Sequence, residues 1–196
     1  MPKRALDNPL VLAILGLLLE RPMHPYDVLG ELRRRSETQA AVITRGSVYD
    51  IVAALNTAGW VAETARLRQG NRPERTVYAL TDAGRDELVR RLDEQIRNPR
   101  RDFTPFVGAV AYLGALGPDG AADALTERAE RLRERTAADE QNLAGVLDQG
   151  LPRLYMIEAE YALHQARSEL AWIDATIEEI RAGRLPWPAP ATEEGP

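Results

Sequence analysis

Four segments in the first half of the chain repeat apolar residues at helical spacing, namely residues 9–20, 25–35, 45–58 and 82–97. The first of them is apolar on nearly every side, so we expect it to form a buried helix. The other three are each apolar along one face, which is typical of helices that cover a core. In the last segment this face contains Leu88, Leu92 and Ile96, and we expect all three side chains to point inward.

Between the third and fourth of these helices the spacing changes to short runs of strand-forming residues. Residues 61–67 and 76–80 are rich in Val, Thr, Tyr and Leu, and the turn sequence QGNRP lies between them. This arrangement predicts a two-stranded hairpin. The order helix, helix, helix, hairpin, helix is that of a winged helix-turn-helix domain.

Capping residues mark the ends of two of these helices. Thr44 is expected to cap the third helix at its start, and Ser47 with Asp50 would make a capping box one turn later. Gly59 is expected to close that helix at its end. Thr81 is expected to cap the fourth helix.

The second half of the chain shows helical spacing only. Its predicted helices cover residues 105–116, 119–148 and 153–182. In the last helix apolar residues follow a strict 3-4-3-4-3 spacing, which is typical of a coiled-coil seam. The seam consists of Leu163, Ala166, Leu170, Ile173, Ile177 and Ile180. We expect it to form a dimer interface, and an intrachain helix pair is the alternative.

The charge of the chain changes sign where the sequence NPRR at residues 98–101 breaks the helical pattern. The net charge is −5, but residues 1–101 carry 17 basic and 13 acidic residues, whereas residues 102–196 carry 8 and 17. Such an asymmetry indicates a nucleic-acid-facing half and a separate acidic half. We therefore predict a mainly α protein, an α+β winged helix-turn-helix domain with a two-stranded wing followed by an all-α domain. The expected parts are a DNA-binding domain at 1–98, a helical dimerisation and effector domain at 99–185, and a flexible tail at 186–196.

The composition excludes several other classes of function. The chain has no cysteine and only two histidines, His24 and His164, one in each half, so we expect no cofactor, metal site or catalytic triad and no enzymatic activity. The apolar run at residues 10–19 is too short to span a bilayer, and Asn8 and Pro9 begin it as an ordinary helix. We expect a cytoplasmic protein that associates with the nucleoid by binding DNA.

The third helix occupies the position of a recognition helix, which in such domains enters the major groove. Its first turn is polar and contains a glycine, so backbone N–H groups and side chains can approach a phosphate closely. A basic hairpin tip would suit the minor groove. The predicted DNA-binding residues are Thr44, Arg45, Gly46, Ser47, Tyr49, Arg68, Asn71, Arg72 and Arg75. The alternatives are a packing helix with a half-buried tyrosine and a solvated surface hairpin.

The first half resembles the PadR family of bacterial transcriptional regulators. The resemblance covers residues 8–97 and rests on LAILGLLLERPMHPYDVLGEL, TRGSVYDIVAALNTAGWV and GNRPERTVYALTDAGR. The family pattern has Gly, a small residue, a variable residue and Tyr at the start of the third helix, as in Gly46, Ser47 and Tyr49. The second half is similar to the longer members, in which a helical domain serves dimerisation. The resemblance implies a homodimeric repressor that releases its promoter when a small molecule binds.

Aromatic residues are concentrated in the second half. A pocket for a planar aromatic effector could draw on Phe103, Phe106, Tyr112, Tyr161, His164 and Trp172. The alternative, which we favour for any single one of them, is that these are plain core or interface residues. We therefore predict a DNA-binding repressor of a pseudo-palindromic promoter site, released by a small hydrophobic or aromatic effector. The alternative is a winged-helix adaptor that binds a protein partner and no DNA.

Overall fold

The computed structural model describes residues 5–35, 43–67, 75–99 and 103–187 of the 196, except that the side chains of residues 65–67 and 75 are not described. The chain separates into two compact units, Met1–Arg101 and Asp102–Pro196. Each unit is described by itself below.

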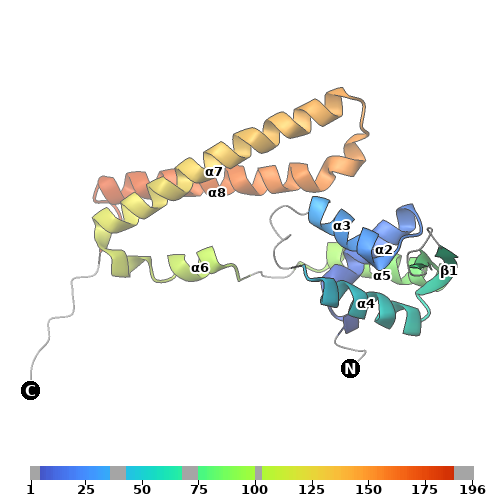
Figure 1. Cartoon of the computed structure of the whole chain (residues 1–196). Coiled ribbons are helices and arrows are strands. Elements are labelled where there is room, and N and C mark those ends of the chain that lie inside the picture. Colours follow the sequence, from blue (N-terminus) through green and yellow to red (C-terminus); the bar gives the residue numbers. More distant parts are fainter. Residues whose placement is uncertain (1–4, 36–42, 68–74, 100–102, 188–196) are drawn as a thin grey trace, which may run out of the picture. The chain divides into compact units, whose positions relative to one another are not determined.

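The first unit has the predicted order of elements. Its elements are α2 (Leu10–Glu20), α3 (Pro25–Arg35), α4 (Arg45–Thr57), β1 (Val61–Leu67), β2 (Arg75–Leu80) and α5 (Asp82–Arg97) (Figure 1). The strands pair antiparallel from Val61 opposite Leu80 to Leu67 opposite Arg75, with a bulge between Glu63 and Ala65. Met23 and Tyr78 exchange two backbone hydrogen bonds of 3.0 Å, which add a one-residue third strand to the hairpin.

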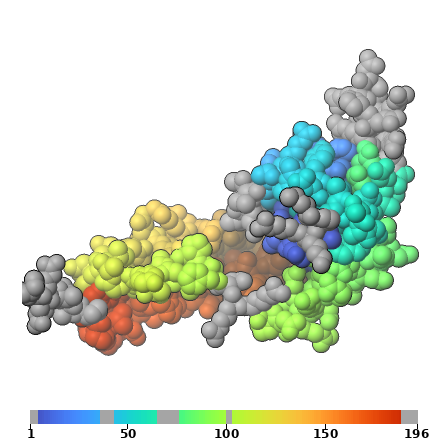
Figure 2. All heavy atoms as spheres, turned by 90° about the horizontal axis from the view of Figure 1, so that it is seen from below, coloured from blue at the N-terminus to red at the C-terminus, as the bar shows by residue number. Residues whose placement is uncertain are grey.

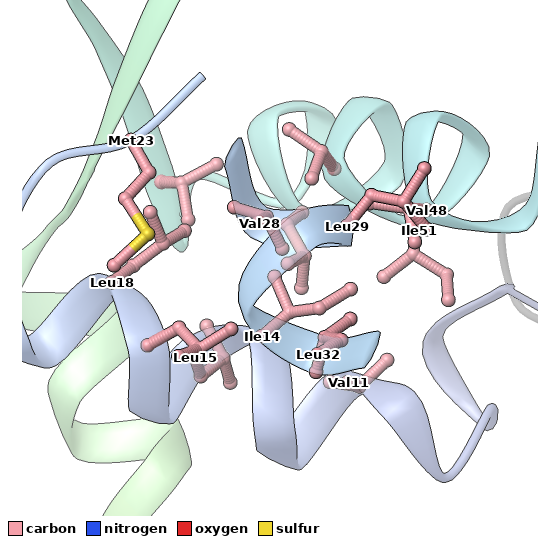
Figure 3. Close-up of a cluster of buried hydrophobic side chains, with 14 of the residues drawn as sticks. Val11, Ile14, Leu15, Leu18, Met23, Val28, Leu29, Leu32, Val48 and Ile51 are labelled. Atoms are coloured by element: carbon pink, nitrogen blue, oxygen red, sulfur yellow. The ribbon is translucent and has the colours of Figure 1, made fainter. Parts of the chain in front are cut away.

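One core holds the helices of the first unit together, and α2 lies at its centre. Figure 3 shows Val11, Ile14 and Leu15 of α2 facing the apolar residues of α3 and α4. These three side chains have no exposed surface. Because each fully buried aliphatic side chain stabilises the fold by about 1.5–3 kcal/mol, this core fixes the angle at which α4 lies on the unit.

Helix α5 differs from the sequence prediction. Leu88 is buried at 4% exposure, but Leu92 is 39% and Ile96 is 80% exposed. The prediction that Leu92 and Ile96 point inward is wrong, because α5 extends beyond the core and no residue after Leu88 belongs to the core cluster of the described residues. Together with Val89, which is 59% exposed, they form an open apolar stripe on α5.

The second unit is helical throughout its described part. Its elements are α6 (Pro105–Val110), η1 (Leu113–Leu116), α7 (Gly117–Asp148), η2 (Arg153–Met156) and α8 (Ile157–Arg181). The predicted helix 105–116 is thus two short helices, since Gly108 and Gly114 lower its helix propensity. Helices α7 and α8 run antiparallel side by side (Figure 1).

The apolar seam of α8 packs inside the chain. Leu163, Ile173, Ile177 and Ile180 are buried without any partner chain, and Ala166 and Leu170 are half-buried. The three isoleucines lie against Leu125 and a row of three alanines on α7, Ala121, Ala122 and Ala129. The expectation of a dimer interface is therefore corrected for the four buried residues, and for Ala166 and Leu170 it stays a prediction. The alanines let the two helices approach closely, so α7 already covers the seam.

The beginning of the predicted tail is also part of this unit. The Trp187 indole Nε1–H donates a hydrogen bond of 2.8 Å to the Gly114 carbonyl, and Leu185 and Trp187 pack against the α7–α8 cluster. The prediction of a flexible tail from residue 186 is therefore wrong for Trp187. Residues 188–196 lie outside the described part of the chain.

Candidate nucleic-acid interface

Helix α4 begins with a capped polar turn. Thr44 has an extended backbone, and its Oγ1 accepts a hydrogen bond of 3.2 Å from the Ser47 backbone N–H. The Ser47 hydroxyl donates in turn to the Thr44 carbonyl at 2.8 Å. These bonds leave the N–H groups of Arg45 and Gly46 at the positive end of the helix without an acceptor among the described residues. A phosphate oxygen can take that place.

Asp50 has no part in capping. Its carboxylate is exposed and makes no hydrogen bond or ion pair with any residue that the structure describes. The capping box predicted for Ser47 and Asp50 is wrong, because Thr44 already provides the cap and turns the Ser47 hydroxyl back toward its own carbonyl. Asp50 thus places a carboxylate one turn into the helix with no partner in the described part of the chain.

The other end of α4 closes as predicted. Gly59 has a φ of 76°, a conformation that favours glycine, and follows the last helical residues directly. The Trp60 N–H donates to the Leu55 carbonyl and the Gly59 N–H to the Asn56 carbonyl, both at 3.0 Å. This pair of bonds is a Schellman motif, and it turns the chain from α4 into β1.

Aromatic and cationic side chains hold the first turn of α4 in place. The Arg45 guanidinium carbon lies 5.2 Å from the centroid of the Tyr49 ring, a cation–π contact. The His24 ring approaches Tyr49 edge-on, with centroids 6.1 Å apart. His24 also begins α3, since its carbonyl accepts from Asp27 and Val28 and its Nδ1 accepts from the Tyr26 N–H. Tyr49 therefore lies between α3 and the exposed Arg45.

The position of α4 depends on Arg33 at the end of α3. Its Nε and Nη2 donate to the Ile43 carbonyl at 3.3 and 2.9 Å, just before the Thr44 cap. The neighbouring Arg34 and Arg35 are paired to carboxylates instead, and these pairs lower the pKa values of Glu31 and Glu20. Sequence reasoning missed both His24 and Arg33. The only local signal was the His-Pro start of α3 and its basic last turn.

The structure brings the first five predicted DNA-binding residues together on one turn. Arg45, Gly46 and Thr44 are exposed, and Ser47 and Tyr49 are partly so. Figure 2 shows α4, in cyan, open on this face of the first unit. The predicted residues Arg68, Asn71 and Arg72 lie outside the described part of the chain. Arg75 is the first residue of β2, and its side chain is likewise not described.

The predicted effector residues do not form one site. Phe106 and Trp172 make an edge-on contact with centroids 6.1 Å apart, and the Arg128 guanidinium carbon lies 3.6 Å from the Phe106 centroid. Phe103 and Tyr112 are 79% and 80% exposed. The remaining two, Tyr161 and His164, are on exposed turns of α8 at least eight residues before Trp172. Since each residue adds about 1.5 Å of rise along a helix, they lie at least about 12 Å from Trp172 along α8.

Two further features are absent from the described part of the chain. No group of three or more His, Asp or Glu side chains is arranged there to hold a metal ion. Within the same residues, none of the helices combines the length and the apolar character needed to cross a membrane.

A winged helix-turn-helix unit with an open, capped first turn on its third helix, joined to a helical second unit, defines a winged-helix transcription regulator. The family model described as the Transcriptional regulator PadR-like family matches residues 14–90. Over 195 residues the chain is 30% identical to the probable transcriptional regulator Rv1176c of Mycobacterium tuberculosis, covering 88% of this chain and 97% of that protein. The chain belongs to the PadR-like family of transcriptional regulators, which are DNA-binding transcription factors.

Solved structures share the fold. Bacillus subtilis PadR in complex with operator DNA matches with a TM-score of 0.73 at 20% identity, over 88% of this chain and 99% of that chain. The same protein in complex with p-coumaric acid matches with a TM-score of 0.70 at 18% identity, over 89% and 99%. The smu.1604c protein of Streptococcus mutans matches with a TM-score of 0.60 at 22% identity, over 86% and 98%. The predicted fold class, a winged helix followed by a helical region, is confirmed.

Proposed function

We propose that this chain is a homodimeric repressor that binds a pseudo-palindromic promoter site and releases it when a small hydrophobic or aromatic molecule binds. The observation that carries the proposal is the capped first turn of α4, whose Arg45 and Gly46 N–H groups lie open beside the Arg45–Tyr49 pair. A recognition helix contacts DNA with the residues at its start. We assign DNA binding to residues 1–98 and dimerisation and effector binding to residues 99–185.

Within the first unit, the DNA contacts are assigned to two places. Thr44, Arg45, Gly46, Ser47 and Tyr49 would meet the sugar–phosphate chain and base edges in the major groove. The hairpin would reach the minor groove with its polar and basic residues, Arg68, Asn71, Arg72 and Arg75. Asp50, which is free of any cap, would repel phosphate, so we expect α4 to meet the backbone at its first turn only.

Two apolar surfaces support a dimer in place of the α8 seam. On α5, Val89, Leu92 and Ile96 form the open stripe, and on the second unit Leu154 and Ile157 are 77% and 49% exposed. Exposed apolar surface of this extent is typical of protein–protein contacts. A two-fold dimer would place its two α4 helices on half-sites one helical turn, or a multiple of it, apart.

A small effector is supported by the family and by the aromatic content of the second unit. The relative from Bacillus subtilis was crystallised with p-coumaric acid, a small aromatic acid. In this chain Phe106 and Trp172 are the two predicted effector residues that lie together, so we place the aromatic part of the effector nearest to them. Phe103, Tyr112, Tyr161 and His164 would contact it only after a rearrangement or from a second copy of the chain.

Fluorescence anisotropy of the full chain on labelled DNA from its own upstream region tests DNA binding. The affinity should fall with salt at a log–log slope of about −0.9 per phosphate contacted. Tyr49→Ala combined with Arg72→Ala should weaken binding by about tenfold or more, since phosphate and base contacts are lost together. Arg97→Ala, which removes an exposed arginine paired with Asp93 on α5, is the matched control and should leave the affinity unchanged.

The alternative function, an adaptor that binds a protein through α4 and no DNA, predicts the opposite result. No upstream fragment would then bind, at any salt concentration. The basic hairpin sequence favours DNA over this alternative, because a hairpin facing a protein would be more apolar.

A further inference from the structure

One face of α7 carries a shallow depression that the proposed function does not use. Its volume is about 210 Å³, and it is lined by Ala124, Glu127, Arg128, Arg131, Leu132 and Arg135. These residues follow one another at helical spacing, so three arginines on successive turns face the same space. The apolar part of the lining consists of Leu132, which is buried, and Ala124, which is exposed.

The charges around this depression are unbalanced. Arg128 is paired with Glu169 of α8 at 2.6 Å, and Arg131 is paired with Glu127 on its own helix. Arg135 makes no ion pair or hydrogen bond with any residue that the structure describes. It lies one turn after Arg131, and like charges at this spacing destabilise a helix.

This imbalance is unusual for the unit in which it occurs. Residues 102–196 contain 17 acidic and 8 basic residues, so carboxylates for pairing are abundant. The other arginine on this part of α7, Arg133, is paired with Asp174 on α8. An external anion would provide the partner that Arg135 lacks, and the short surface pair of Arg131 can open to share it at little cost.

One residue of the lining, Arg128, also contacts an aromatic pair outside the depression. Arg128 lies both on the wall of the depression and over the ring of Phe106, which contacts Trp172. A ligand with an apolar body would therefore meet Leu132, Ala124 and the cationic edge of this cluster. Its anionic group would meet Arg131 and Arg135, since guanidinium groups bind carboxylate and phosphate oxygens in pairs.

We propose that the depression on α7 binds a small organic anion, with a carboxylate or phosphate group held by Arg131 and Arg135 and an apolar body on Leu132 and Ala124. The anion site itself does not depend on the proposed function. Only the statement that the bound anion is the effector rests on that function. Phe106 belongs to α6, the first helix after the segment that follows α5. An anion that draws Arg128 off the Phe106 ring would thus act on the element next along the chain to the DNA-binding unit.

Isothermal titration of the full chain tests the site without DNA. The probes are benzoate and phenyl phosphate, with inorganic phosphate as the bare anion and benzamide as the neutral analogue of benzoate. At least one of the two organic anions should bind, and benzamide should not. Arg135→Gln should weaken binding by about tenfold, because it removes a charge-assisted contact. Arg133→Gln, an exposed arginine on another face of the same helix, should leave it unchanged.

Three results would overturn the proposal. They are an absence of binding by both organic anions, equal binding by the wild type and Arg135→Gln, and binding of inorganic phosphate as tight as that of phenyl phosphate. Anisotropy on operator DNA separates this inference from the proposed function. If the chain binds DNA normally but binds no organic anion, only the anion site is overturned. If the chain binds an organic anion but no DNA, only the proposed function is overturned.

Discussion

The two units of this chain bury their apolar residues in different ways. The first unit closes one core, mainly from α2, α3 and α4 with Val61 of β1 and Leu88 of α5, and leaves a polar turn at its surface. The second unit is a pair of long helices joined through isoleucines on α8 and alanines on α7. Among the described residues, ten of the fifteen exposed large hydrophobic side chains lie in the second unit. The first unit thus leaves open mainly the apolar stripe on α5, whereas the second exposes apolar side chains on α6, η1, η2 and α8.

The largest expected effect on stability comes from removing a buried isoleucine, and its size should differ between the two cores. Ile14→Ala in the first unit should lower the free energy of unfolding by about 3–5 kcal/mol, because side chains from three helices hold the cavity open. Ile173→Ala in the second should cost less, about 2–3 kcal/mol, because a helix pair can close partly around the lost volume. Both residues have no exposed surface, so the two substitutions are matched in burial.

Hydrogen exchange followed by mass spectrometry on the full chain measures both substitutions. Ile14→Ala should speed exchange in α2, α3 and α4 and leave α7 and α8 unchanged, and Ile173→Ala should do the reverse. If either substitution speeds exchange in both units equally, the two cores are one cooperative structure and the comparison between them fails.

The next effect concerns the open apolar surface of the second unit. Ile157→Glu should weaken the proposed dimer by about tenfold or more, since a charge would be buried without a partner at the interface. Sedimentation velocity over a range of protein concentrations measures the change. Ala162→Glu, on the exposed side of α8 and without a large apolar side chain to lose, is the control. A dimer equally sensitive to both substitutions would show that the exposed apolar residues are not its interface.

Much of the first unit could be predicted from the sequence because its signals are local. The cap at Thr44 and the stop at Gly59 depend on residues within a few positions of the helix ends, and both were found. His24 and Arg33 were missed because they reach from the two ends of α3 to Tyr49 and Ile43, contacts that spacing along one helix does not reveal. Leu92 and Ile96 were misplaced for a related reason, since the helical spacing of α5 continues past the end of the core.

The second unit was harder to predict because heptad spacing predicts which face of a helix is buried, but not which helix packs against that face. The seam of α8 could meet α7 or a second copy, and the sequence favoured the second copy. The alanine row on α7 was the missing signal. A row of small residues on a polar helix permits close packing, and it is this row that covers Ile173, Ile177 and Ile180.

A smaller effect on stability, which depends on pH, comes from the cluster of Glu87, Arg90 and Arg91 on α5. Hydrogen bonds and ion pairs with Arg90 and then Arg91 lower the pKa of Glu87 to about 2. Because the folded pKa lies below the ordinary value of 4.5, the stabilisation is full above that value and is lost as the pH falls from about 4.5 toward 2. Arg91 also donates to the Leu6 carbonyl, so the cluster ties α5 to the start of the first unit.

Denaturant unfolding at pH 7 and at pH 3 measures this contribution. Glu87→Gln should destabilise the first unit at pH 7 by about 1–2 kcal/mol, a value reduced by the exposure of Arg90, and by less at pH 3. Glu94→Gln removes a more exposed partner of Arg90 and should have a smaller effect at both values. A Glu87→Gln penalty that does not diminish in acid would assign the role of Glu87 to packing.

The smallest effect is a gain in stability from the helix pair itself. The Thr136 hydroxyl on α7 is buried at 6% exposure and has no hydrogen-bond partner among the described residues. Thr136→Val keeps the shape of the side chain and removes the unpaired oxygen, so it should stabilise the second unit by up to about 1 kcal/mol. Thr126→Val is the control, because the Thr126 hydroxyl is bonded to the Ala122 carbonyl at 2.7 Å and its loss should bring no gain. Hydrogen exchange in α7 and α8 should slow for Thr136→Val alone. Unchanged exchange in Thr136→Val would show that the oxygen of Thr136 has a partner in solution. Slower exchange in both variants would show that the gain comes from the added methyl group and not from removing an unpaired oxygen.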